Sequence, residues 1–360
     1  MNNTSPRTKT FFIVGSQRSG TTLLATMLGN HPDILVEDSS IGFRLVGCFG
    51  LYKDVLPHNL EHNWSQIQSW LIREDYKKRL AGLIDPKEVQ EGGNARVIIA
   101  DAIHKRLNNS NKQVFGDKSP NLQFYVSDML TLIPDAKFIH IIRDGRDAAL
   151  SKSIRGYRNM KLAAQEWVDG NIMGLHNEAM IGKENYLMVK YEDLINAPDV
   201  TLKQICPVLN VEYSDLMLNT SNSSSGRSYV KCHLDSSGIN KAISQLSHNQ
   251  IKSLEKIMGP LLHRFGYALI NKEFEKRYVP LTLSGKIFLN QMDSLRHLFR
   301  SKIVGMQKRA LVDVRVPFRS RLKTAMLRLA RDFFPDELFK KIIRRKWIKE
   351  LYMPADRNDA

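Results

Sequence analysis

The chain has 360 residues, of which 42% are apolar and 25% charged, and its formal net charge is +16. This composition excludes a disordered chain and is typical of a globular protein with a sizeable core. No apolar stretch approaches the length of a membrane span or of a signal-peptide core. Three widely separated cysteines, Cys48, Cys206 and Cys232, predict neither disulfides nor a metal site, and we therefore expect a cytoplasmic protein.

The positive charge is distributed unevenly along the chain. Residues 271–360 carry 22 Lys and Arg against 10 Asp and Glu, a net +12, whereas the first 270 residues have a net charge of only +4. The charge therefore gives no reason to expect nucleic-acid binding by the main domain. We expect a domain over residues 1–270, with a helical insert at about 41–107, and a basic, mainly helical C-terminal extension over 271–360.

The segment Phe11–Pro32 predicts a buried strand, a turn and a helix in that order. Gly15 and Gly20 bound the turn with the spacing of a nucleotide-binding P-loop, which aims backbone N–H groups at a phosphate. Thr21 stands where the P-loop has lysine, and the cation has moved into the loop as Arg18. Such a loop suits a group with less charge than a triphosphate. A strand–helix turn without a ligand is the alternative.

A second short strand is expected over residues 33–40, and it ends in two acids, Glu37 and Asp38. A carboxylate at this place can act as a general base, and a helix cap or a surface charge is the alternative.

The stretch QVFGDKSP predicts a strand that begins at Val114 and is broken by Gly116. Lys118 is then expected at a turn, before a helix opened by Pro120. Ligands of open α/β sheets bind at the carboxyl ends of strands, so Lys118 is a candidate functional residue. A solvated turn lysine is an equal alternative.

The apolar run 138–142 predicts another buried strand, and Arg143 follows it directly. Ser151 lies eight residues later in a predicted helix, where its hydroxyl can share an anion with Arg143. A guanidinium offers a fork of donors suited to a terminal phosphate. The alternative is a salt-bridged turn within the run RDGRD. We expect His140, inside the strand, to be a hydrogen-bonded core residue and not a base.

Further along, we expect a strand at 186–189, helices at 200–209 and 246–269, and a mobile loop at 219–226. Together these elements predict an α/β fold, a P-loop-like three-layer core in which a short parallel sheet is flanked by helices.

Taken in order, GSQRSGTTLL, HPD with the acidic pair, GDKSP, FIHIIRDGRDAALS and VKYEDL resemble the sulfotransferase family that uses 3′-phosphoadenosine 5′-phosphosulfate (PAPS). The resemblance runs from about Thr10 to Leu269. It is to the branch with an Arg-Ser-Gly-Thr-Thr loop, as in tyrosylprotein and many bacterial sulfotransferases. It implies an enzyme that moves the sulfuryl group of PAPS in line to an acceptor hydroxyl or amine of a glycan, a lipid or a small molecule.

The resemblance also implies roles for individual residues. Arg143 and Ser151 would bind the 3′-phosphate, Tyr191 would lie near the adenine, and Lys118 would lie near the leaving group. The loop would hold the 5′-phosphosulfate, with Arg18 bridging toward the sulfuryl group. Its residues are Ser16, Gln17, Arg18, Ser19, Gly20, Thr21 and Thr22.

The acidic pair resembles the Glu-Glu pair that supplies the family's base. Counting from Arg18 without gaps puts Asp38 opposite the first glutamate and Ser39 opposite the second. This departure leaves the choice of base between Glu37 and Asp38 open.

The chemistry agrees with this resemblance. A sulfuryl group carries about one negative charge less than a phosphoryl group, so we expect no metal. Arg18, Lys118 and the loop N–H groups would stabilise the charge that develops on oxygen. Two rivals remain: a P-loop kinase of a small acceptor, and a non-catalytic protein that binds nucleotides or anionic membranes.

Residues 281–351 fall outside the resemblance. Their apolar residues keep helical spacing and are flanked by Lys and Arg, which predicts basic amphipathic helices able to lie on an anionic membrane surface. Helices packed on the core, or a surface for an anionic acceptor, are the alternatives. The sequence predicts neither the acceptor nor the oligomeric state.

Overall fold

The computed structural model describes residues 9–38, 95–156, 158–219 and 236–293. The chain divides into two compact units, Met1–Ala148 with Asp169–Lys241 and Ala149–Val168 with Ala242–Ala360. The division at residue 270, which the charge distribution suggested, stays a prediction. Most of the predicted insert, the loop after residue 219 and most of the basic extension lie outside the described residues.

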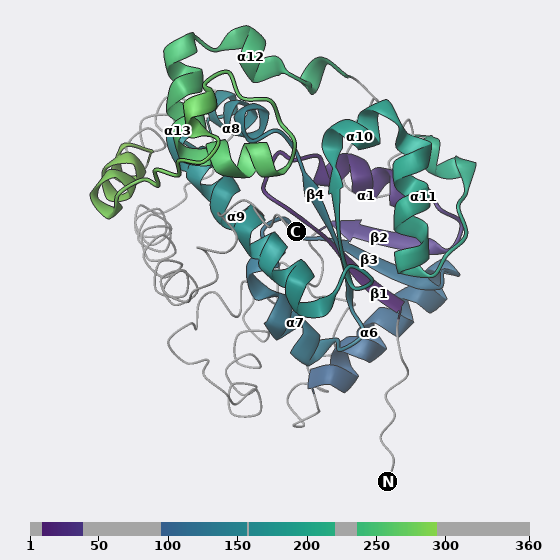
Figure 1. Ribbon diagram of the computed structural model, residues 1–360. Coiled ribbons are helices and arrows are strands. Elements are labelled where there is room, and N and C mark those ends of the chain that lie inside the picture. Colours follow the sequence, from purple (N-terminus) through teal and green to yellow (C-terminus); the bar gives the residue numbers. More distant parts are fainter. Residues whose placement is uncertain (1–8, 39–94, 157, 220–235, 294–360) are drawn as a thin grey trace, which may run out of the picture. The chain divides into compact units, whose positions relative to one another are not determined.

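The first unit is built on a parallel sheet of five strands in the order β2-β3-β1-β4-β5 (Figure 1). The strands are β1 (Lys9–Val14), β2 (Ile34–Asp38), β3 (Val114–Lys118), β4 (Lys137–Ile142) and β5 (Tyr186–Lys190). Because all five run in the same direction, their carboxyl ends meet at one edge of the sheet, where ligands of such folds bind.

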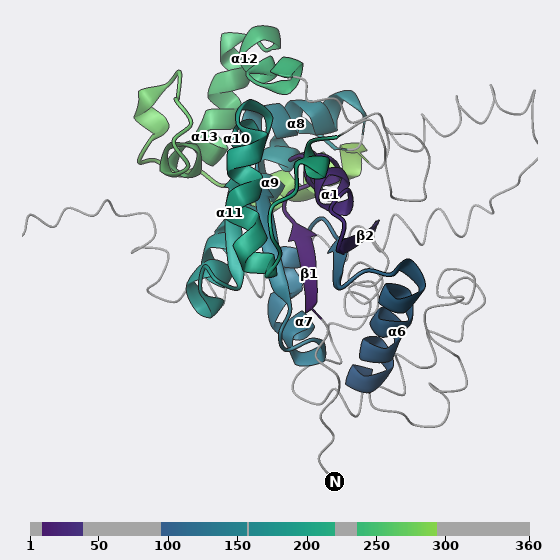
Figure 2. The same cartoon turned by 90° about the vertical axis from the view of Figure 1, so that its right-hand side faces the viewer.

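The side chains of each strand alternate between two apolar layers. Phe11 and Ile13 pack against α1 and α11 on one face, and Phe12 and Val14 pack against α6 and α7 on the other. Figure 1 shows α1 and α11 on one side of the strands and α6 and α7 on the other, and Figure 2 shows α11 and α6 on opposite sides of β1. The helices of this unit are α1 (Thr21–Gly29), α6 (Ala95–Ser110), α7 (Val126–Leu132), α10 (Tyr191–Asn196) and α11 (Pro198–Leu209), with the short turns η1 (Leu122–Tyr125), η2 (Asp215–Leu218) and η3 (Ser236–Gly238). This is the three-layer α/β core that the sequence predicted.

The strand β3 corrects one expectation. Gly116 does not break it, since the ladder to β1 continues through Lys118. A Cβ atom on Gly116 would lie 2.4 Å from the ring of Phe11, so the glycine makes room for a neighbouring aromatic side chain inside the sheet. Lys118 is therefore the last residue of a strand and not part of a turn.

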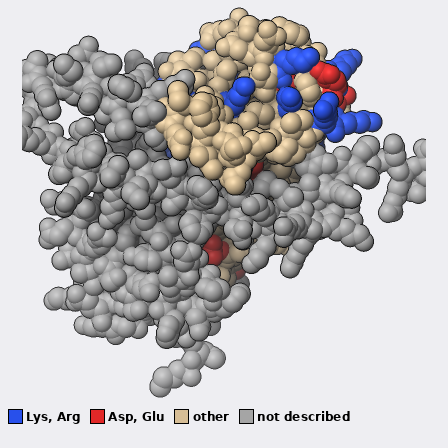
Figure 3. All heavy atoms as spheres, turned by 90° about the vertical axis from the view of Figure 1, so that its left-hand side faces the viewer, with Lys and Arg blue, Asp and Glu red and all other residues tan. Residues whose placement is uncertain are grey.

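The second unit is helical where it is described. It contains α12 (Lys241–Gln245), α13 (His248–Arg264), η4 (Lys272–Phe274) and a helical segment over 283–293, and it shares α8 (Gly145–Ile154) and α9 (Met160–Ile181) with the first unit. A capping box formed by Ser247 and Gln250 begins α13, whose predicted apolar stripe is buried. Lys and Arg side chains stand out on one face of the described residues, beside a few acidic ones (Figure 3).

Candidate functional site

The loop between β1 and α1 is a tight turn closed by a hydrogen bond from Ser19 N to Ser16 O of 3.2 Å. Gly15 and Gly20 have φ of 137° and 100°, and Arg18 also has a positive φ, of 76°. A Cβ atom on Gly20 would lie 2.4 Å from the Tyr191 ring, which explains the requirement for glycine there. The backbone of the loop is thus held close to the ends of β4 and β5.

The loop presents donors that have no partner among the described residues. The hydroxyls of Ser16 and Ser19 are buried without a hydrogen-bond acceptor there. The first turn of α1 carries no acidic residue, and no side chain caps its N-terminus at Gly20. Free N–H groups at a helix N-terminus together with buried hydroxyls favour an anion such as a phosphate or a sulfate.

The two neighbouring acids of β2 point to opposite faces of the sheet. Glu37 pairs with Arg106 of α6. The carboxylate of Asp38 lies 2.9 Å from Lys118 Nζ, which also donates to Thr22 Oγ1 at 3.2 Å. Asp38 and Lys118 therefore lie at the first turn of α1, next to the loop.

Arg143, at the end of β4, reaches toward the loop from the other side. Its Nη1 donates to the carbonyl oxygen of Arg18 at 3.1 Å and its Nη2 to that of Gly238 at 2.6 Å. The guanidinium carbon lies 4.6 Å from the centre of the Tyr191 ring, a cation–π contact. The structure thus brings Arg143, Tyr191 and the loop together. Ser151 lies in α8 within the second unit, and its role stays a prediction.

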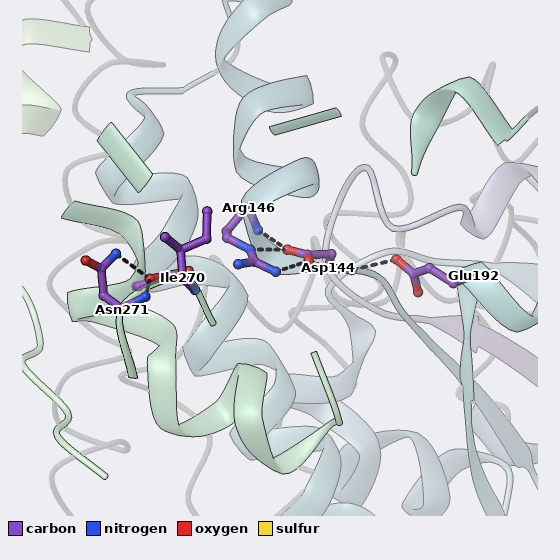
Figure 4. A network of polar contacts seen from close by, with 6 residues as sticks. Asp144, Arg146, Glu192, Ile270 and Asn271 are labelled. Carbon is purple, nitrogen blue, oxygen red and sulfur yellow. Dashed lines mark hydrogen bonds and ion pairs between the residues drawn. The ribbon is translucent and has the colours of Figure 1, made fainter. Parts of the chain in front are cut away.

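The rest of the RDGRD turn is a structural network (Figure 4). Arg146 binds both oxygens of Asp144, at 2.6 and 3.0 Å, and the backbone N–H of Asp144 donates to Glu192 Oε1 at 2.9 Å. The salt-bridged turn considered as an alternative therefore exists between Arg146 and Asp144, and Arg143 also reaches the loop through its bond to Arg18. Glu192, the first acid of the YED motif, fixes this turn, a role that the motif alone did not indicate.

His140 is a core residue, as predicted. It is fully buried below the loop, and its Nδ1 lies 2.7 Å from the hydroxyl of Tyr186. Burial lowers the pKa of His140 to about 3 and outweighs the neighbouring Asn171 side chain, which raises it. A neutral, enclosed imidazole of this kind is not available as a general base for an acceptor.

A further polar side chain at the loop was missed in the sequence. Gln123 of η1 is fully buried, and its Oε1 accepts a hydrogen bond of 3.3 Å from Gly15 N. No local motif marks this residue, because its contact joins positions more than a hundred residues apart.

Comparison with known proteins identifies the class of this site. The model of the Sulfotransferase family matches residues 10–215, more than half of the chain. The chain belongs to the sulfotransferase family. This confirms the family predicted from the motifs, a family that implies PAPS as the sulfuryl donor.

Individual sulfotransferases are similar over large parts of the chain. A protein-tyrosine sulfotransferase of Drosophila melanogaster is 30% identical over 217 residues, 58% of this chain and 39% of that protein. Protein-tyrosine sulfotransferase A of Caenorhabditis elegans is 25% identical over 285 residues, 74% of this chain and 68% of that protein. The chain thus spans well under half the length of the Drosophila relative.

A solved structure supports the fold. The sulfotransferase domain of the olefin synthase from Synechococcus PCC 7002 matches with a TM-score of 0.50 and 25% identity, over 73% of this chain and 96% of that domain. Among the described residues, no helix is long and apolar enough to cross a membrane. The same part of the chain holds no cluster of three or more His, Cys, Asp or Glu suited to a metal ion.

Proposed function

We propose that this sulfotransferase moves the sulfuryl group of PAPS to a hydroxyl group of its acceptor. The observation that carries the proposal is the grouping of an anion-binding loop, the Lys118–Asp38 pair and Arg143 at the carboxyl edge of one parallel sheet. The names of the two relatives support a tyrosyl hydroxyl as the first acceptor to test.

The residues present fit the donor. The hydroxyls of Ser16 and Ser19, which have no partner in the described part of the chain, and the N-terminus of α1 suit the oxygens of the 5′-phosphosulfate. Arg143, beside the aromatic ring of Tyr191, provides a cation and a stacking surface suited to a phosphorylated nucleoside. When bound, PAPS supplies the sulfuryl group and a phosphate leaving group.

Different side chains act as the general base and stabilise the charge that develops during transfer. Asp38 lies on the sheet face that carries α1 and takes the proton of the acceptor hydroxyl. Glu37 lies on the opposite face of the sheet, where it pairs with Arg106. Lys118, beside Thr22, donates toward the oxygen on which charge develops, together with Arg18 and the loop N–H groups. Because this charge is smaller than in phosphoryl transfer, we propose that no metal ion is needed.

Three further statements remain predictions. These are the Arg-Ser-Gly-Thr-Thr branch of the family, the location in the cytoplasm, and contact of residues 281–351 with anionic membranes.

Calorimetric titration with 3′-phosphoadenosine 5′-phosphate (PAP), with AMP as the matched control, tests the donor site. We expect wild type to bind PAP at least tenfold more tightly than AMP and Arg143→Ala to lose this preference, because a guanidinium suited to the 3′-phosphate is removed. Equal binding of PAP and AMP by wild type would contradict the proposal. Phosphate transfer that depends on Mg²⁺ and ATP would instead support a kinase.

The acceptor is tested by incubating the protein with ³⁵S-labelled PAPS. The acceptors compared are a tyrosine peptide, its phenylalanine counterpart and a panel of alcohols and glycans. Label on the tyrosine peptide alone supports a tyrosyl acceptor. Label on another member of the panel redirects the acceptor without removing the class, and no label on any hydroxyl speaks against the transfer.

A further inference from the structure

The segment that follows β3 forms two hydrogen bonds to Gly15, at the start of the loop. The carbonyl oxygen of Gly15 accepts from Asn121 N at 3.0 Å, and the Gly15 N–H donates to Gln123 Oε1 at 3.3 Å. The main-chain carbonyl oxygen of Gln123 in turn accepts from Asn177 Nδ2 of α9 at 2.7 Å, which anchors the backbone at this residue. The hydrogen bond from Gly15 N places the carboxamide oxygen of Gln123 toward the loop.

This orientation leaves the nitrogen of the carboxamide buried without a partner. Gln123 is fully buried, and its Nε2 has no hydrogen-bond acceptor among the described residues. Ser16 Oγ, on the residue after Gly15, is buried and equally unmatched. An unsatisfied buried donor costs roughly 1–3 kcal/mol, so two of them side by side indicate a missing acceptor atom.

Gly170 of α9 shows that these two donors lie close to each other. A Cβ atom built on Gly170 would lie 2.7 Å from Gln123 Nε2 and 3.0 Å from Ser16 Oγ. A side chain at position 170 would thus collide with Gln123 and Ser16, so the glycine lets the two donors lie close together beside α9. Both donors belong to the surroundings of the anion-binding loop, since Ser16 is part of that loop.

We propose that Gln123 is a ligand-binding residue of this enzyme, whose Nε2 donates, together with Ser16 Oγ, to an oxygen of the 5′-phosphosulfate. The inference rests on the proposed function, because it places the group that the loop holds. Both atoms are neutral donors, which suits an anion oxygen already close to the positive end of α1. The carboxamide of Gln123 thus binds the ligand through its nitrogen and positions Gly15 of the loop through its oxygen.

The test is calorimetric binding of PAP and of PAPS at pH 8.5 to the full chain and two variants. Gln123→Glu keeps an oxygen for the Gly15 N–H but removes the NH₂ donors, and Gln123→Met removes both. We expect at least tenfold weaker binding for both variants. Loss for PAP and PAPS alike assigns the contact to a phosphate oxygen, and loss for PAPS alone assigns it to a sulfuryl oxygen.

A matched control is Gln165→Met in the second unit. Gln165 is also buried, but it is satisfied by Tyr278 Oη at 2.8 Å and Leu281 N at 2.9 Å. This variant should lower the melting temperature and leave binding unchanged. Wild-type binding by both Gln123 variants would show that Gln123 Nε2 does not contact the ligand and would overturn the inference. Weakening by Gln123→Met alone would reduce Gln123 to a clamp on Gly15 and would also overturn it. Failure of wild type to bind PAP would instead count against the proposed function.

Discussion

Glu37 and Asp38 show how one step along a strand separates two roles. Successive side chains of a strand point to opposite faces, so only Asp38 shares the α1 face with Lys118 and Thr22. We expect Asp38→Asn to lower kcat by roughly 10²- to 10⁴-fold, the range for a positioned general base. Glu37→Gln should change kcat by less than about fivefold, because it alters a salt bridge to Arg106 on the other face.

Steady-state transfer from PAPS to the acceptor found in the labelling experiment measures both variants. Circular dichroism of the purified variants controls for folding. A larger loss of kcat in Glu37→Gln than in Asp38→Asn would assign the base to Glu37.

His140 makes the stability of the protein depend on pH. Its pKa is lowered to about 3 by burial, whereas the unfolded chain titrates near the ordinary value of 6.5. Between these pH values the imidazole is protonated in the unfolded state but stays neutral in the folded state. The contribution of His140 to the free energy of unfolding is therefore fully present above pH 6.5 and falls as the pH is lowered. The expected loss of unfolding free energy from this group is about 2 kcal/mol between pH 6.5 and 5.

Urea unfolding at pH 6.5, 5.5 and 5.0 measures this dependence. His140→Gln should have lower stability at pH 6.5 but a flatter pH dependence, since the titrating group is gone. The exposed-site variant His263→Gln should follow the wild-type curve. An unchanged pH dependence in His140→Gln would show that other groups control it.

At the scale of elements, Glu255 joins α13 to the segment that follows this helix in the chain. Its buried carboxylate accepts from Ile270 N at 3.0 Å, from Asn271 N at 2.8 Å and from Asn271 Nδ2 at 2.7 Å (Figure 4). Glu255→Gln replaces one accepting oxygen by a donor that faces other donors. We expect a loss of about 2–3 kcal/mol of unfolding free energy, which denaturant unfolding measures.

Glu273→Gln is the matched control for this change. Glu273 is exposed and forms an ion pair of 3.1 Å with Lys252 at the surface. Its loss should cost less than about 1 kcal/mol. Similar losses in the two variants would mean that Glu255 does not hold the segment through its hydrogen bonds.

The elements themselves were largely predictable, because their signals are local. The apolar runs before Gly15 and Arg143 fall on β1 and β4, and the order of strand, loop and helix follows from them. Gly116 misled the prediction, since a glycine in a strand indicates a break unless one knows that the Phe11 ring packs on it. The separate partners of Glu37 and Asp38 and the contact of Gln123 with Gly15 depend on the register of distant strands and turns, which a single sequence does not contain.

At the scale of the whole molecule, the charge distribution predicts where the protein meets an anionic surface. Residues 271–360 hold +12 of the net +16. A basic residue near an anionic membrane contributes about 1 kcal/mol, so neutralising four of them should weaken binding more than tenfold. We expect the full chain to sediment with phosphatidylserine vesicles at low salt and to be released at high salt. Changing Lys340, Lys341, Arg344 and Arg345 to Gln should abolish this binding.

The control changes four exposed lysines outside the predicted amphipathic segments, Lys252, Lys256, Lys272 and Lys276, to Gln. Equal loss in both variants would indicate an effect of net charge alone, and no loss in either would contradict membrane binding by the C-terminal segment.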